Sequence, residues 1–518
     1  MRRLALLSVS DKHGIEDFAR GLVELGFTII STGGTQKALE KAKINVTPVE
    51  KATGFSECFG GRLKTLHPLI FGGILFKRGD KTHVAEVKKL GIEPIDLVCV
   101  NLYPFEETLH QLTGVSDAGQ AAALSQEHRT LLIEQIDIGG PSLLRAAAKN
   151  AESVTVLCDP QDYTSVLAEL KDAKDTKPET RKRLAEKVFL HTAAYDCAIT
   201  RTLSDGDHAG VMLTNRMKLR YGENPHQWGA FYELKGNPPD WVVLQQEEKQ
   251  MSYLNILDAD GAWNLVCEFE EPTAACIKHA NPCGVASHKD IAEAFQRAYD
   301  ADRLSAFGVI IALNRTCTKA VVEKILEQKI FVEIIIAPAY EPEALELIRK
   351  KPRIRVIENH CQKPKAEITS FRTALGGMLV QNLDTRVVTE KDLKCVTDTK
   401  PTKEQIRDLL FAWKVVKHAK SNAIVFVKDA CTVGIGAGQT SRVDSTIIAA
   451  RRAGEKAKGA MMASDAFFPF PDSVEEAAKY GIAAIIQPGG SIRDEEVIAK
   501  ANELKIPMIL TGIRGFRH

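Results

Sequence analysis

An ammonium and an imidazole are neighbours at Lys278 and His279, in the segment KHANPCG of residues 278–284. Histidine can hold or release a proton near neutral pH, and a lysine beside it supplies fixed charge for a developing oxyanion. The apolar run of residues 274–277 indicates a buried strand before the pair. We expect the chain to turn at Asn281-Pro282 and to leave both groups at a strand end, where open α/β sheets bind ligands. A surface lysine and a structural histidine explain these residues equally well.

Groups suited to phosphate recognition follow strands in the first third of the chain. The turn TGGT, residues 32–35, lies between an expected strand (27–30) and an expected helix (36–43). Backbone N–H groups at such a helix N-terminus attract phosphate. The loop GGRLKTLHP, residues 60–68, sets two cations beside paired glycines. An ordinary βα turn and a solvated surface loop are the alternatives.

Two further segments of this region are expected to place polar side chains near a strand end or a turn. The strand of residues 95–100 is followed by Asn101 and Tyr103. The turn DIGGP begins with Asp137 and leads into an expected helix (142–149), which ends with Lys149. Its proline suits a first helical turn. A carboxylate beside two glycines favours a site over an exposed polar helix face.

Four further loops in the last two thirds contain residues typical of binding sites. They are SNA (421–423), GIGAGQTSR (434–442), SDAFFPF (464–470) and QPGGS (487–491), and RYGENPHQ (220–227) is a separate turn crowded with polar groups. The glycine spacing of the second differs from that of a Rossmann dinucleotide site, so none is expected. The phenylalanines of the third suit a flat heteroaromatic ligand, and a core cluster is their alternative.

The composition describes a globular protein of several domains. The chain has 518 residues, of which 44% are hydrophobic and 26% charged, and this length exceeds that of one core. A net charge of +1 gives no field for nucleic acid or an anionic membrane. The 11 cysteines include no CxxC motif, which favours reduced thiols in a cytoplasmic protein. The apolar runs are too short to span a bilayer.

The order of the expected elements predicts the fold class. Strands at 4–9, 27–30 and 46–49 alternate with helices, an order that favours a parallel sheet with right-handed crossovers. The polar segment 204–210 is the best candidate for a domain boundary. The remainder shows no fixed-period repeat but fits two similar α/β modules, with a strand expected at 218–221 and a helix expected at 261–269.

Ten motifs occur in one order along the chain: SVSDK, TGGT, GRLKTLHP, NLYPF, IDIGGP, RAAAKN, LRYGENPHQ, KHANPCG, GAGQTSR and SDAFFPF. Together they resemble, over essentially the whole length, the bifunctional purine-biosynthesis family with AICAR formyltransferase and IMP cyclohydrolase activities. The resemblance implies the last two steps of IMP synthesis, formyl transfer from 10-formyltetrahydrofolate to AICAR followed by dehydrative ring closure of FAICAR.

The resemblance also implies an architecture. A methylglyoxal-synthase-like domain (1–204) would close the ring. Two cytidine-deaminase-like α/β modules (205–518, divided near 365–400) would transfer the formyl group. Formylfolate would serve as cosubstrate, with no metal or redox cofactor. The family is usually a homodimer with transferase sites across the subunit interface, and no nucleic acid or membrane partner is implied.

The resemblance assigns site residues in three groups. Ring closure would use Ser10, Lys12, Gly33, Gly34, Thr35, Arg62, Lys64, Thr65, Asn101, Tyr103, Asp137, Ile138 and Lys149. AICAR would be bound or acted on by Arg220, Tyr221, Asn255, Lys278, His279, Gly308, Glu333, Asn422, Arg442 and Arg514. The folate side would be lined by Val443, Phe467, Asp472, Ser491 and Ile492.

The chemistry suggests a role for some of these residues. His279 is the expected base for the amine proton, worth roughly 10²–10⁴ in rate. Lys278, aided by Asn422, is expected to stabilise the oxyanion. Lys64, Tyr103, Asp137 and Lys149 provide donors and a proton route for ring closure, without a readable division of labour.

Three departures from the family pattern affect these assignments. The segment 115–130 is longer than expected. Phe71 replaces an expected histidine, and Pro471 replaces an expected basic residue near Asp472.

Two other functions compete with this interpretation. A zinc nucleobase deaminase shares a histidine and the Pro282-Cys283 pair, but position 286 is Ala286 rather than the second cysteine, and no H-x-E precedes the turn. Stoichiometric zinc would support that alternative. The first domain could instead be a regulatory ligand-binding module, in which case a fragment 1–204 would close no ring.

Overall fold

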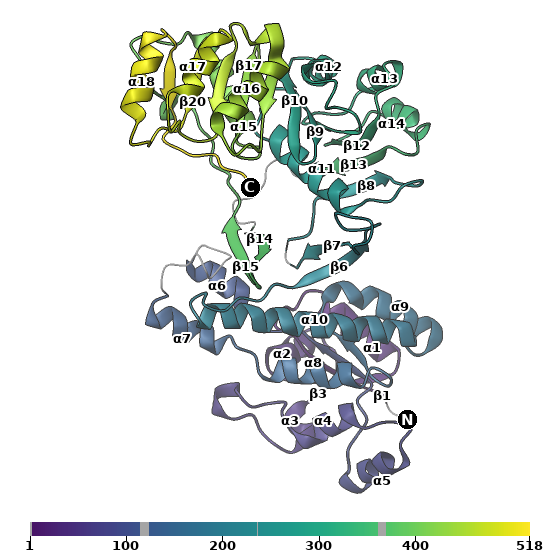
Figure 1. Ribbon diagram of the computed structural model, residues 1–518. Coiled ribbons are helices and arrows are strands. Elements are labelled where there is room, and N and C mark those ends of the chain that lie inside the picture. The colour runs from purple at the N-terminus through teal and green to yellow at the C-terminus, as the bar shows by residue number, and fades with distance from the viewer. Residues whose placement is uncertain (1–2, 114–123, 236, 361–368) are drawn as a thin grey trace. The chain divides into compact units, whose positions relative to one another are not determined.

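The computed structural model describes residues 3–113, 124–235, 237–360 and 369–518. The chain forms two compact units (Figure 1). The first comprises Met1–Thr214 and Leu234–Gly236, and the second comprises Asn215–Glu233 and Asn237–His518. The described part of segment 115–130 begins at residue 124, and residues 115–123 lie outside the description.

The first unit is built on a five-stranded parallel sheet of order β3-β2-β1-β4-β5. The strands are β1 Arg3–Ser8, β2 Phe27–Ser31, β3 Val46–Pro48, β4 Leu97–Val100 and β5 Thr155–Leu157. The predicted parallel sheet is confirmed. Strand order reverses between β1 and β4, and such a switch point is where open α/β sheets bind ligands.

Helices surround this sheet and complete its core (Figure 1). They are α1 Ile15–Glu24, α2 Gly33–Lys41, α3 Val49–Thr53, α4 Pro68–Leu75, α5 Lys81–Leu90, α6 Phe105–Thr113, α7 Gln126–Glu134, α8 Gly139–Lys149, α9 Tyr163–Ala173 and α10 Pro178–Leu203. Helix α2 begins at Gly33, three residues before the predicted start, so both glycines of TGGT lie in its first turn. The helices α3 to α7 were not predicted from hydrophobic periodicity.

The second unit contains a mixed sheet of twelve strands. Its order is β16-β21-β20-β19-β17-β18-β10-β9-β11-β12-β13-β8. The strands of its first half are β8 Trp241–Gln245, β9 Thr273–Lys278, β10 Asn281–Ser287, β11 Val309–Leu313, β12 Val332–Ala337 and β13 Arg355–Asn359. Those of its second half are β16 Lys394–Cys395, β17 Ile424–Lys428, β18 Cys431–Gly436, β19 Met461–Ser464, β20 Ala484–Gln487 and β21 Met508–Leu510.

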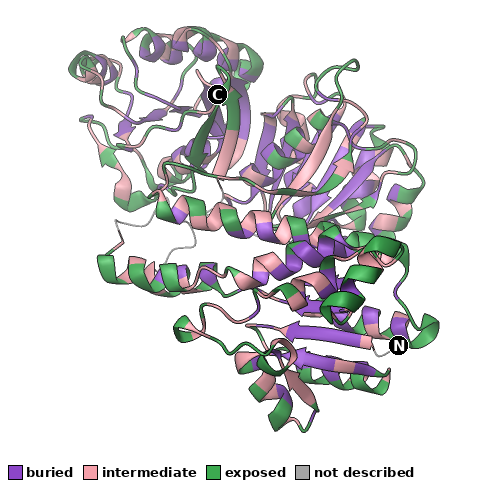
Figure 2. Ribbon diagram, turned by 90° about the horizontal axis from the view of Figure 1, so that it is seen from below, coloured by how far each residue is buried: buried purple, intermediate pink, exposed green. Residues whose placement is uncertain are grey.

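Helices pack against both halves, and the sheet interior is buried whereas outward helix faces are exposed (Figure 2). The first half carries α11 Tyr253–Val266, α12 Ile291–Ala301, α13 Lys319–Glu327 and α14 Pro342–Arg349. The second carries α15 Lys403–Val416, α16 Arg442–Ala453, α17 Asp472–Lys479 and α18 Asp494–Glu503. Two small two-stranded sheets are separate from the large sheet, β6 Leu213–Lys218 with β7 Ala230–Leu234, and β14 Thr369–Ala374 with the exposed strand β15 Gly377–Asn382.

The two halves of this sheet repeat one topology. In each, a helix precedes an antiparallel strand pair, and three further strands follow with helical crossovers, in the orders β10-β9-β11-β12-β13 and β18-β17-β19-β20-β21. The halves join through Ala286 of β10 and Cys431 of β18. The prediction of two similar α/β modules is confirmed, whereas their likeness to cytidine deaminase stays a prediction.

Three local predictions in this unit were wrong. The chain turns at His279 and Ala280, not at Asn281-Pro282, which begin β10. The proline is accommodated beside an irregularity in the β9–β10 register, the kind of place where a strand tolerates a missing N–H. Helix α11 begins at Tyr253 rather than at residue 261, because Ser252 and Asn255 form a capping box. The strand predicted at 218–221 lies instead at Leu213–Lys218.

Candidate functional sites

In the first unit, residues that follow β1 and β4 are joined by hydrogen bonds at the switch point. The Asn101 Oδ1 atom accepts hydrogen bonds from the backbone N–H groups of Ser10 and Asp11, the latter at 3.0 Å. The Thr35 hydroxyl accepts from Val9 N and donates to Val9 O, both at 2.9 Å. These contacts fix the β1 loop against the start of α2. The predicted residues Ser10, Thr35 and Asn101 are therefore brought together.

Two ammonium groups lie at the N-terminus of α2. A Cβ atom on Gly33 would lie 3.7 Å from Lys64 Nζ, and one on Gly34 would lie 3.8 Å from Lys12 Nζ. Lys12 donates to the Val9 and Ser10 carbonyl groups, and burial lowers its pKa. The absence of side chains at both glycines leaves the helix N-terminus open beside the two cations. This arrangement suits an anionic ligand such as a phosphate.

Asp137 lies at the start of α8. Its Oδ1 atom accepts from Gly140 N at 2.8 Å, and its backbone N–H donates to the Tyr195 hydroxyl at 2.9 Å. Burial raises the pKa of the Asp137 carboxyl, while hydrogen bonding from the Gly140 and Tyr103 backbones and the charge of Lys64 oppose that rise. The structure thus places Asp137, Tyr103 and Lys64 in one neighbourhood.

Three other predicted residues of this unit have distinct positions. A Cβ on Gly139 would lie 2.9 Å from Thr65 Oγ1, so Thr65 borders the Asp137 turn. Arg62 forms an exposed ion pair with Glu134. Ile138 is the exposed residue preceding α8.

Lys149 is not brought to this neighbourhood. It is the last residue of α8, whereas Asp137 precedes the first. A rise of 1.5 Å per residue separates the two ends of this helix by roughly 15 Å. The following residue, Asn150, donates to the carbonyls of Ile74 and Phe76 at 2.7 and 3.1 Å, so this end of α8 packs beside the end of α4.

In the second unit, Lys278 and His279 lie at the β9–β10 turn. Lys278 Nζ donates to the Phe307 carbonyl at 2.6 Å. His279 is exposed and has a φ of 54°. The adjacent Gly308, with a φ of +70°, lies against Phe331 and Glu333. The predicted residues Lys278, Gly308 and Glu333 therefore border one another.

A buried arginine that sequence reasoning missed supports this region. Arg355, only 1% exposed, donates to Glu333 Oε2 at 2.7 Å and to the Lys249 carbonyl at 3.0 Å. Burial acts against ionisation of Glu333, but the charges and hydrogen bonds of Arg355 and Lys249 prevail and lower its pKa. The positive charge of Arg220 in turn acts on Arg355. A charged residue between strand residues gave no sequence signal for this role.

Arg220 and Tyr221 contact one another. Arg220 Nη2 donates to the Tyr221 hydroxyl at 2.5 Å, while Arg220 Nε is buried without a hydrogen-bond partner. Asn255 is buried, and its Oδ1 atom accepts from Ser252 N and Oγ in the helix cap. Asn255, a predicted AICAR-binding residue, thus uses its side-chain oxygen in the helix cap, whereas the buried Nε donor of Arg220 has no hydrogen-bond partner.

The second module contributes a buried cluster around Asn422. Arg442 donates to Asn422 Oδ1 at 2.7 Å, to Ser464 Oγ at 3.0 Å and to Asp465. Asn422 itself donates to the Gln439 and Thr440 carbonyls. The two modules meet where Lys420 N donates to Asn281 Oδ1 at 2.9 Å. Asn422 and the Lys278–His279 turn therefore belong to one connected region. Arg514, another predicted binding residue, lies with its guanidinium over the Phe516 ring.

The residues predicted for the folate side lie at the carboxyl ends of strands in the second module. They are Val443 and Asp472 in the first turns of α16 and α17, Phe467 after β19, and Ser491 and Ile492 after β20. Phe467 and Ile492 are exposed, the latter completely. Exposed apolar side chains at this edge fit a flat ring system, and Pro471 caps α17 directly before Asp472.

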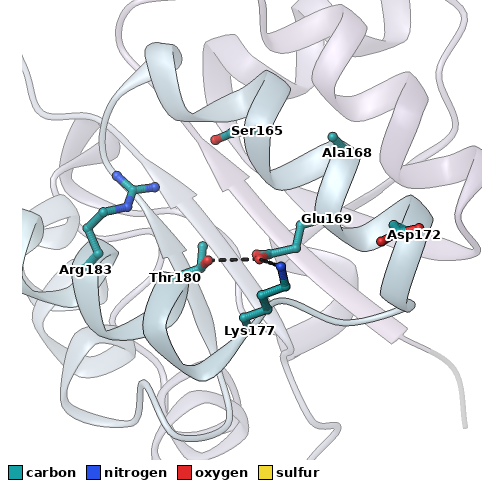
Figure 3. Close-up of a pocket in the computed structure, with 7 residues that line it drawn as sticks. All are labelled: Ser165, Ala168, Glu169, Asp172, Lys177, Thr180 and Arg183. Atoms are coloured by element: carbon teal, nitrogen blue, oxygen red, sulfur yellow. Dashed lines mark hydrogen bonds and ion pairs between the residues drawn. The ribbon is translucent and has the colours of Figure 1, made fainter.

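Two cavities lie apart from these residues. A polar hollow of about 380 Å³ between α9 and α10 is lined by Glu169, which accepts from Thr180 and pairs with Lys177 (Figure 3). An apolar cavity of about 330 Å³ in the second unit includes Trp241 and Trp263. Within the described ranges, no three His, Cys, Asp or Glu side chains converge as ligands of a metal ion would, and no helix is long and apolar enough to span a membrane.

Each unit thus has its own group of charged side chains near the ends of its strands, an arrangement typical of an α/β enzyme. Comparison with known families specifies which one. A family model described as the AICARFT/IMPCHase bienzyme matches residues 147–452, and an MGS-like domain matches residues 14–142. The chain belongs to the AICARFT/IMPCHase bienzyme family.

Curated relatives agree along the whole chain. Proteins named bifunctional purine biosynthesis protein PurH from Bacillus thuringiensis subsp. konkukian (strain 97-27) and Bacillus cereus (strain 03BB102) are each 49% identical over 526 residues, covering 100% of both chains. The crystal structure of ForH is 35% identical and has a TM-score of 0.34, covering 39% of this chain and 100% of its own. The expected family and its two activities, which complete IMP synthesis, are confirmed.

Proposed function

We propose that formyl transfer takes place at the Lys278–His279 turn of the second unit, with AICAR as acceptor and 10-formyltetrahydrofolate as donor. The observation that carries this proposal is the meeting of Lys278, Gly308 and Glu333 beside an exposed imidazole. His279 removes the amine proton, and Lys278 stabilises negative charge on the formyl oxygen. Arg220, Tyr221, Asn255, Asn422, Arg442 and Arg514 hold the acceptor nucleotide.

Support for the donor comes from the chemistry of the exposed edge. Phe467 and Ile492 offer apolar surface for a flat ring, and Val443, Asp472 and Ser491 lie at the same ends of the second-module strands. This edge adjoins the Asn422–Arg442 cluster, because Val443 follows Arg442 in α16. Holding the two substrates together would supply much of the acceleration.

Ring closure is proposed to take place in the first unit, residues 1–204. Lys12, Lys64 and the Gly33–Gly34 helix start would hold the phosphate, with Ser10, Thr35, Arg62, Thr65, Asn101 and Ile138 around the ribotide. Asp137, Tyr103 and Lys64 would carry the proton transfers. Lys149 stays a proposed participant in ring closure. The variant Lys149→Ala tests this role, because full ring closure by the folded variant would show that Lys149 takes no part.

A single assay tests both assignments. AICAR and 10-formyltetrahydrofolate are supplied, and FAICAR and IMP are separated by chromatography. His279→Ala is expected to abolish formyl transfer yet close the ring of supplied FAICAR, and Lys64→Ala is expected to do the reverse. Loss of both activities in either folded variant would contradict the two-site assignment.

We also propose a homodimer. The exposed side chains Ile492, Phe467 and Phe307 border the proposed transferase site and leave it open to solvent in one chain. A second chain covering this region would exclude water from the reaction. Sedimentation velocity tests the proposal, since a monomer at concentrations that give full formyl transfer would contradict it.

A further inference from the structure

The repeated modules contain the same two-residue turn between their paired strands. His279 and Ala280 connect β9 to β10 with φ values of 54° and 57°, and Asp429 and Ala430 connect β17 to β18 with values of 53° and 52°. Two consecutive positive φ values define a hairpin turn that favours glycine at its second central position. Both turns have an alanine there, so both depend on contacts from outside the hairpin.

An aspartate on the preceding helix makes those contacts in each module. Asp258 Oδ1, on α11, accepts from Ala280 N at 2.6 Å. Asp408, on α15, accepts from Asp429 N at 2.7 Å and from Ala430 N at 2.9 Å. Both aspartates are buried, and each stands 22 residues before its alanine. The helix, the aspartate and the turn therefore form one repeated structural device.

The devices differ in the side chain that the turn presents. The first presents an imidazole and the second a carboxylate, Asp429. The charges acting on Asp258 come from His279, Lys420 and Glu333, and burial raises its pKa while the imidazole and the ammonium oppose that rise. Asp408 has Arg407 Nε at 3.9 Å and no histidine in its turn.

We propose that Asp258 is a positioning residue for formyl transfer, which holds the His279 turn in its strained conformation and places a negative charge beside the imidazole. This inference rests on the proposed role of His279 as base. The Asp258 carboxylate can stabilise the positive charge that forms on the imidazole when His279 accepts the amine proton. Asp408 holds the conformation of its own turn but has no imidazole beside it.

Asp258→Asn separates charge from hydrogen bonding, because an amide oxygen can still accept from Ala280 N. Asp408→Asn is the matched control in the other module of the full-length protein. The kcat of formyl transfer and the KM for AICAR are measured over about pH 5 to 9, which spans the range in which a histidine gains or loses its proton. Ring closure of supplied FAICAR and the melting temperature report folding of each variant.

We expect Asp258→Asn to lower kcat about tenfold and to leave the KM for AICAR unchanged, since the amide supplies no negative charge to the imidazolium that forms as His279 accepts the amine proton. Asp408→Asn should leave both unchanged. An unchanged kcat in Asp258→Asn, or equal losses in the two variants, would overturn the inference. Should His279→Ala retain formyl transfer, the proposed function would fail instead, whatever the two asparagine variants show.

Discussion

At the residue scale, Asp137 combines a cost in stability with a proposed role in ring closure. Burial raises the pKa of its carboxyl above the ordinary value. A carboxyl whose pKa is higher in the folded state favours folding only when protonated, so this contribution to stability is lost as pH rises from the unfolded pKa through the folded one.

Asp137→Asn is therefore expected to raise the melting temperature at pH 7 and to lower ring closure by about 10² or more, as loss of a proton-transfer group does. The amide can still accept from Gly140 N. Scanning fluorimetry and the FAICAR assay measure the two effects. A variant that is less stable and fully active would contradict the prediction.

Arg355 forms an ion pair with Glu333, a residue proposed to contact AICAR, and the guanidinium of this pair is buried. Its guanidinium contacts Glu333, whose side chain is 21% exposed and whose pKa is lowered. A depressed carboxylate pKa contributes stability above the unfolded pKa, and that stability is lost as pH falls through the folded pKa. Removing one partner of a buried pair typically costs about 3–5 kcal/mol.

Arg355→Met should lower the free energy of unfolding by about that amount and raise the KM for AICAR, because Glu333 loses its fixed partner. Arg353, two residues earlier, is the control: its pair with Glu248 is 82% and 51% exposed, and Arg353→Met should change stability by less than about 1 kcal/mol. Urea unfolding and AICAR titration measure both. Equal costs in the two variants would show that burial does not decide the outcome.

Motif residues and supporting residues differed in how far sequence could predict them. Gly33 follows strand β2, Lys278 ends strand β9 and Asp137 precedes two glycines at the start of α8, and at each position the local sequence indicates a site. Arg355 and Asp258 lie within a strand and a helix whose sequences resemble any half-polar element. Their roles come from contacts 22 residues away along the chain, with Glu333 and Ala280 respectively. Such contacts leave no local pattern.

At the element scale, hydrophobic patterns located buried strands such as β1, β2, β4 and β9, but the ends of elements were harder to predict. Pro282 was expected to end a ladder, yet it lies in β10 beside a register irregularity. The start of α11 was missed because its cap, Ser252, precedes an apolar first turn. Proline and capping signals both depend on neighbours that only the fold supplies.

The close packing of the paired strands on their helices gives an element-scale prediction. A Cβ on Gly284 would lie 1.8 Å from the Ala298 carbonyl of α12, and one on Gly434 would lie 2.1 Å from the Ala449 carbonyl of α16. Backbone atoms of a helix cannot move aside without displacing the helix. Gly284→Ala and Gly434→Ala should each lower the free energy of unfolding by about 3 kcal/mol or more.

Gly377→Ala is the control, since the nearest atom to its added Cβ is 3.7 Å away. Chemical unfolding of the three variants measures the effect. Losses below about 1 kcal/mol at positions 284 and 434 would show that the helices lie farther from the strands than described.

At the scale of the whole molecule, the repeat within the second unit could be expected only as a loose similarity. Its corresponding elements keep their order and direction, but few residues are shared: Lys278-His279-Ala280 corresponds to Lys428-Asp429-Ala430. Packing preserves a topology and a few glycines and aspartates, whereas most positions vary freely. Sequence therefore indicated two modules without fixing how they join.

The division into two units, each with a core of its own, predicts that the two reactions can be supplied by different molecules. The residues proposed for ring closure belong to the first unit and those proposed for formyl transfer to the second. His279→Ala and Lys64→Ala should each convert AICAR poorly to IMP alone, because each lacks one step. An equimolar mixture should restore IMP formation, with FAICAR passing through solution between the variants. The measurement is the time course of IMP after mixing, and a lag should shorten as total protein rises. If each variant keeps its one activity but the mixture makes no IMP, FAICAR does not leave the molecule that makes it, and the two units act as one catalytic body.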